Sequence, residues 1–150
     1  MIRLLRLGAC AWVVGALSGC HDESDKPSPS AGLKVALPKG WVAKEAGQNM
    51  LLAGPPDHGV LRLEKQNGGA VPTVAAVDAI FSEQKVIITK KESSSDFLGY
   101  QYSMPVAEGG TQTAMLGFRH VGSSVFRCAS TPAATTVEVD QAFEACRTME

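Results

Sequence analysis

The sequence lacks most of the residue patterns that carry chemistry. Its 150 residues include three histidines, no two of them at zinc-ligand spacing, and no Cys-x-x-Cys pair. Gly122-Ser123-Ser124 lacks the second glycine of a hydrolase nucleophile elbow. Neither Gly68-Gly69 nor Gly109-Gly110 leads into a Gly-Lys-Ser phosphate loop. These absences predict a protein with no metal, no cofactor and no catalytic activity.

A surplus of positive charge is also missing. The chain has 14 lysines and arginines against 15 aspartates and glutamates. Two of the basic residues, Arg3 and Arg6, lie at the extreme N-terminus, and no basic stripe follows. The composition therefore argues against nucleic acid as a partner, and against electrostatic adhesion to anionic lipid.

No apolar run is long enough to cross a membrane. The run from Leu7 to Leu17 covers 11 residues, whereas a spanning helix needs roughly 20. It follows Arg3 and Arg6 and precedes the small residues Ser18 and Gly19. A basic segment, an apolar segment and small residues in this order are typical of a secretory signal.

The expected cleavage site reads Leu17-Ser18-Gly19-Cys20 instead of Ala-x-Ala. It resembles the lipobox of bacterial lipoproteins, whose cysteine is diacylated on sulfur and becomes the mature N-terminus. The resemblance implies that residues 1–19 are removed and that Cys20 anchors the protein in the membrane. Two acyl chains hold far more firmly than one, which binds only marginally. In the proteins that this site resembles, aspartate directly after the lipidated cysteine favours retention in the inner membrane. Here that position is His21. The resemblance therefore implies the outer membrane, on its periplasmic face or at the surface.

Residues 21–31 contain two prolines, three serines and three acidic residues, and no aliphatic residue larger than alanine. Such a segment buries too little apolar surface to offset its ordering entropy. It predicts a flexible tether of roughly 18 Å root-mean-square span. The tether joins Cys20 to a single domain over residues 32–150, which is long enough for a hydrophobic core.

Two cysteines remain once Cys10 leaves with the signal and Cys20 carries lipid. Cys128 and Cys146 form an even pair in an exported chain, for which a disulfide is the default. A redox pair or a metal pair is the alternative, but no histidine lies within four residues of either cysteine. Closing a loop of this length stabilises the fold by roughly 3 kcal/mol.

Hydrophobic periodicity predicts an α+β fold, in which two helices pack on a mainly antiparallel sheet of about six to seven strands. Thr73 is the expected N-cap of the first helix, and Val74, Val77, Ile80 and Phe81 are expected on its buried stripe. In the second helix, the inward positions are Val139, Phe143 and Cys146, with Ala142 and Met149 beside them. The strands are expected at residues 33–37, 50–53, 60–65, 86–90, 97–104, 111–121 and 125–130.

This order of elements resembles the PsbP-like fold, found in photosynthetic PsbP proteins, a Ran-binding nuclear import factor and many small bacterial lipoproteins. The residues that carry the resemblance are Leu37-Pro38-Lys39-Gly40-Trp41 at the entry, Phe81 in the central helix, and Phe126 and Phe143 in the closing strand and helix. For bacterial members, the resemblance implies an accessory or binding role in the envelope. The fold itself does not determine a function.

Trp41 and the 54–59 loop, which contains His58, are the candidates for a ligand cleft. For Trp41, a core or sheet-edge position is the commoner alternative, and for the Asp57-His58 pair a solvated loop. The first hypothesis is an envelope lipoprotein that contacts another envelope protein as an accessory module. The alternative is a module that binds a small ligand or a cell-wall fragment, and an enzyme ranks third.

Overall fold

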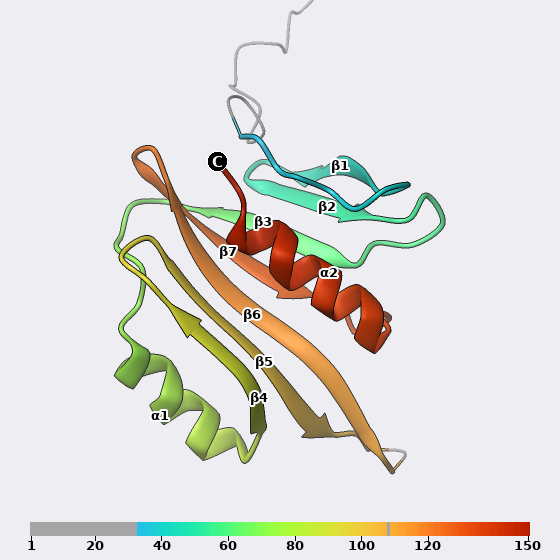
Figure 1. The fold of residues 1–150 in the computed structure, drawn as a ribbon, viewed down its shortest axis with the longest axis vertical. Coiled ribbons are helices and arrows are strands. Elements are labelled where there is room, and N and C mark those ends of the chain that lie inside the picture. Colours follow the sequence, from blue (N-terminus) through green and yellow to red (C-terminus); the bar gives the residue numbers. More distant parts are fainter. Residues whose placement is uncertain (1–32, 108) are drawn as a thin grey trace, which may run out of the picture.

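The computed structural model describes residues 33–107 and 109–150. Seven strands form one antiparallel sheet in the order β1-β2-β3-β7-β6-β5-β4 (Figure 1). The predicted α+β class, with two helices on an antiparallel sheet, is confirmed. The elements are β1 (Val42–Gly47), β2 (Met50–Gly54), β3 (Leu61–Gln66), α1 (Val74–Gln84), β4 (Ile87–Ser93), β5 (Phe97–Pro105), β6 (Thr111–Val121), β7 (Ser124–Ser130) and α2 (Thr136–Arg147).

The two helices pack on opposite faces of the sheet. In β5, Phe97 stacks edge-to-face on Phe143 of α2, with ring centroids 5.7 Å apart. Tyr100, three positions further along β5, stacks edge-to-face on Phe81 of α1, with ring centroids 5.1 Å apart. Side chains separated by an odd number of positions along a strand point to opposite faces. Each face of the sheet therefore has its own hydrophobic cluster.

The larger cluster lies under α2 and contains the disulfide between Cys128 and Cys146. Both cysteines are fully buried, and their Cα atoms are 6.2 Å apart. The bond joins the strand β7 to the last helix, as the sequence predicts. Every predicted inward residue of this helix is buried: Val139, Ala142, Phe143, Cys146 and Met149.

The first predicted strand, residues 33–37, is wrong, because the structure places no strand there. Lys34 instead exchanges two backbone hydrogen bonds with the C-terminal Glu150, at 2.6 and 2.8 Å. Leu33, Val35 and Leu37 pack against the larger cluster, so their alternation reflects burial on one side without sheet pairing. Consequently, the start of the described chain and the C-terminus lie at the same end of the molecule (Figure 1).

The apolar stripe of α1 is narrower than predicted. Val77 and Phe81 are buried, but Ile80 is 51% exposed, so its predicted core position is wrong. Val77 and Phe81 pack with Leu98 and Tyr100 of β5 in the smaller cluster, to which Ile80 does not belong. Thr73 is confirmed as the N-cap, since its side chain accepts a hydrogen bond from the backbone N–H of Ala76 at 3.3 Å.

Among residues 33–107 and 109–150, no helix is both long and apolar enough to span a membrane. The predicted signal, the lipidated Cys20 and the tether lie outside the described residues.

Candidate functional site

The loop between β2 and β3 is shaped by its prolines and glycines. The backbone N–H of His58 donates to the carbonyl of Pro55 at 3.3 Å and closes a turn. Gly59 passes directly over the side chain of Leu52, where a Cβ atom would collide with it. This close approach favours glycine. The ring of the preceding residue, His58, lies beside the first turn of α2, where it contacts Glu138.

His58 lies between two carboxylates. Its Nδ1 is 3.1 Å from Oδ1 of Asp57, and its Nε2 is 2.8 Å from Oε1 of Glu138. The hydrogen bond with Glu138, followed by that with Asp57, raises the pKa of His58 above its ordinary value of 6.5. The sequence singles out His58 but not Glu138, which lies 80 positions away.

Glu138 also completes a capping box at the start of α2. Its Oε2 accepts hydrogen bonds from the backbone N–H of Thr135 at 2.8 Å and from the Thr135 hydroxyl at 2.9 Å. The hydroxyl in turn accepts from the backbone N–H of Glu138. Hydrogen bonds from Thr135, more than the pairing with His58, lower the pKa of Glu138. The Thr-x-x-Glu spacing of residues 135–138 is the sequence signal that reveals this role.

Thr135→Ala tests the cap. The substitution removes the side chain that closes the helix start, so we expect the free energy of unfolding to fall by about 1 kcal/mol. Denaturant unfolding followed by circular dichroism measures the loss. Thr135→Ser is the matched control, because serine caps at least as well. An alanine variant as stable as the wild type would show that the cap contributes nothing.

A cavity of about 150 Å³ lies beside this loop. Apart from the loop residues 54–59, its lining comes from Val42 and Lys44 of β1 and Leu52 of β2. Trp41 does not share this lining. It is partly buried and packs against the cluster under α2. The structure therefore separates the two predicted ligand-binding residues, Trp41 at the core margin and His58 at the cavity.

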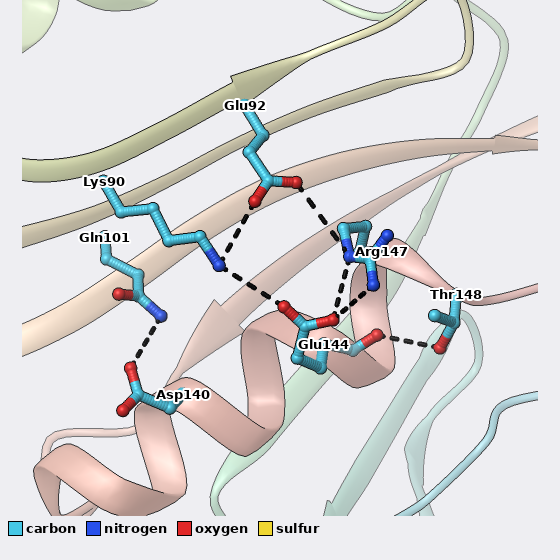
Figure 2. A network of polar contacts seen from close by, with 7 residues as sticks. All are labelled: Lys90, Glu92, Gln101, Asp140, Glu144, Arg147 and Thr148. Carbon is cyan, nitrogen blue, oxygen red and sulfur yellow. Dashed lines mark hydrogen bonds and ion pairs between the residues drawn. The ribbon is translucent and has the colours of Figure 1, made fainter.

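A second polar cluster lies where α2 crosses β4 and β5 (Figure 2). Lys90 contacts Glu92 at 3.2 Å and Glu144 at 3.3 Å, and its ammonium group lies 4.2 Å from the ring centroid of Phe143. Arg147 also holds Glu144, at 2.6 Å. Hydrogen bonding by Arg147, more than by Lys90, lowers the pKa of Glu144. These charges are paired with one another, which is the arrangement of a structural network.

Gln101 on β5 forms a separate polar contact beside this network (Figure 2). It is the one buried polar side chain of the described core, and its amide donates to Oδ1 of Asp140 at 2.9 Å. Beside the network is a cavity of about 310 Å³, lined by Glu92, Ser93, Ser94, Phe97, Arg119 and Arg147.

The remaining candidates bring no reactive set together. No group of three or more potential metal ligands occurs among residues 33–107 and 109–150. His120 lies on β6, remote in sequence from the His58 loop, and is exposed. The sulfurs of Cys128 and Cys146 are consumed by their bond.

Comparison with known proteins adds a distant likeness to solved structures. No protein-family model and no curated protein matches the sequence. A crystal structure from Bacteroides thetaiotaomicron VPI-5482 is similar over 82% of this chain, at 18% sequence identity and a TM-score of 0.46. This chain covers 46% of that protein, less than half its length. At this distance, the likeness carries no conclusion about function.

Proposed function

We propose that the protein is a bacterial lipoprotein, which lipidated Cys20 anchors in the cell envelope, in the outer membrane rather than the inner membrane. Its α+β domain acts as an accessory module that contacts another envelope protein, without catalysis. The observation that carries the proposal is Leu17-Ser18-Gly19-Cys20, placed directly after a basic and then an apolar segment. The PsbP-like assignment of the domain stays a prediction.

The disulfide supports export. Cys128 and Cys146 are bonded and lie in the core under α2. Structural disulfides form and persist in oxidising compartments such as the bacterial periplasm. A buried bond between a strand and the last helix suits a domain that works outside the cytoplasm.

Two features of the described residues favour contact over catalysis. Both ring nitrogens of His58 face carboxylates, so neither offers a free lone pair to a substrate. The cavities beside the His58 loop and beside Arg147 measure about 150 and 310 Å³. Pockets for small molecules typically measure about 300–1,000 Å³. These cavities fall below or at the bottom of that range, so the proposal relies on the outer surface of the domain.

Fractionation of cells tests the anchor. A diacylated protein should remain with membranes through high-salt and alkaline washes and should leave only with detergent, because its acyl chains are buried in the bilayer. Release by salt alone would show electrostatic attachment and would contradict the proposal.

Binding of a small ligand or a cell-wall fragment is the alternative function. The observation that favours it is the cavity beside Arg147, which combines two arginines, two serines and the ring of Phe97. Calorimetric titration with soluble cell-wall fragments tests it. Saturable binding that Arg147→Ala weakens would favour the alternative, and the absence of heat would leave the protein-contact function in place.

A further inference from the structure

The contacts of His58 require a charged ring. A neutral imidazole has one N–H and one lone pair, whereas the imidazolium has two N–H groups. In the structure, one nitrogen faces Asp57 at 3.1 Å and the other faces Glu138 at 2.8 Å. A neutral ring would turn its lone pair toward one of these carboxylates. Only the doubly protonated ring satisfies both contacts.

The two contacts join separate parts of the fold. Asp57 belongs to the same loop as His58, while Glu138 lies in the first turn of α2. The carboxylate of Glu138 is held in place by Thr135 through its other oxygen. The far end of the loop has its own attachment, because the Thr131 hydroxyl donates to the carbonyl of Gly59 at 2.7 Å. His58 is therefore the residue that ties the middle of the loop to α2.

We propose that His58 is a pH-operated latch: its doubly protonated ring holds the 54–59 loop against the first turn of α2, and loss of one proton leaves one of the two carboxylate contacts without a donor, which loosens the loop and opens the cavity beside it. The charged groups in contact with the ring are Asp57 on the loop and Glu138 on α2. Lys44 on β1 lines the same cavity as His58.

The direction of the switch follows from the carboxylates. The hydrogen bond with Glu138 and then that with Asp57 raise the folded-state pKa of His58 above 6.5. A raised pKa means that the latch contributes fully below the ordinary value and is lost as the pH rises through the folded value. The loop is thus held below pH 6.5 and released as the pH rises through the folded-state pKa of His58.

The first test measures the charge on the ring. Nitrogen-15 NMR of histidine-labelled full-length protein in detergent micelles follows His21, His58 and His120 through the titration. We expect His58 to keep both ring protons to a pH above 6.5, the ordinary value of its pKa. Glu138→Gln should lower the midpoint of His58, because it removes the carboxylate that raises the pKa most. Glutamine at this position retains the capping box, so the helix start is preserved while the charge is removed. A wild-type His58 that titrates at or below its ordinary value of 6.5 would overturn the latch.

The second test measures the loop itself. Pro55 and Pro56 have no N–H, so the informative amides are those of Asp57, His58 and Gly59. Hydrogen exchange is compared between wild type and Glu138→Gln at the same pH, which cancels the intrinsic pH dependence. By linkage, protonation must favour the closed loop by the same factor by which Glu138→Gln lowers the proton affinity of His58 in the first test.

Below the pH midpoint of His58, we expect the loop amides to exchange more slowly in wild type than in Glu138→Gln. Above that midpoint, the loop amides of the two proteins should exchange at the same rate. His120→Gln, the matched control, should behave as wild type throughout. If wild type and Glu138→Gln exchange equally at every pH, the ring is charged without holding the loop, and the latch is refuted.

Discussion

Cys20→Ala is expected to abolish lipidation and to leave the full-length precursor uncleaved. The alanine variant has no sulfur to accept the diacylglyceryl group, and in the lipoprotein pathway that this site resembles, cleavage follows that modification. Cells grown with radiolabelled palmitate should label the wild-type protein and not the variant. On a gel, the variant should run larger by the mass of residues 1–19.

Cys10→Ala is the matched control, because it removes a cysteine from the predicted signal without touching the cleavage site. It should be labelled and processed as the wild type is. If the wild-type protein takes up no palmitate, or if the Cys20→Ala variant is still labelled, the lipid anchor is not at Cys20.

Cys128→Ser is expected to lower the free energy of unfolding by about 3 kcal/mol, within a range of about 2–5 kcal/mol. The bond closes a loop across 18 positions and fastens α2 to β7. For a domain of this size, the loss corresponds to a fall in Tm of about 10–20 °C. Denaturant and thermal unfolding of the full chain measure the two quantities, and thiol titration after unfolding should find Cys146 newly free.

Cys146→Ser provides the control for this experiment. It removes the same bond, so its loss of stability should equal that of Cys128→Ser, and the double variant should lose little more than either single variant. Finding both Cys128 and Cys146 as free thiols in wild-type protein purified without reductant would disprove the bond.

The elements that could be predicted from sequence are those with both a clear period and a clear boundary. The strands β5 and β6 alternate and are separated by Glu108-Gly109-Gly110, and they pair as the expected hairpin. In α2, Val139, Phe143 and Cys146 recur at helical spacing and are all buried. The alternation in a strand and the helical spacing in a helix both involve residues close together in the sequence. A short stretch of sequence is therefore enough to predict these elements.

The elements that could not be predicted depend on distant partners. Every residue of β1 is exposed, because this edge strand has no covered face, and so it shows no burial period. Residues 33–37 alternate like a strand, but Lys34 bonds to Glu150 at the other end of the chain. Likewise, a sequence window that contains His58 cannot include Glu138, the partner that fixes its charge. In each case, the missing information is a contact between residues far apart in the sequence.

The measurement that tests the proposed function most directly is crosslinking in intact cells that express the lipidated wild-type protein, with the adducts identified by mass spectrometry. We expect one dominant adduct with another envelope protein. Cys20→Ala should lose this adduct, because the uncleaved precursor carries no lipid and does not reach the membrane in which the partner is expected. The result that contradicts the account is a wild-type protein that is processed, lipidated and abundant, yet forms no protein adduct.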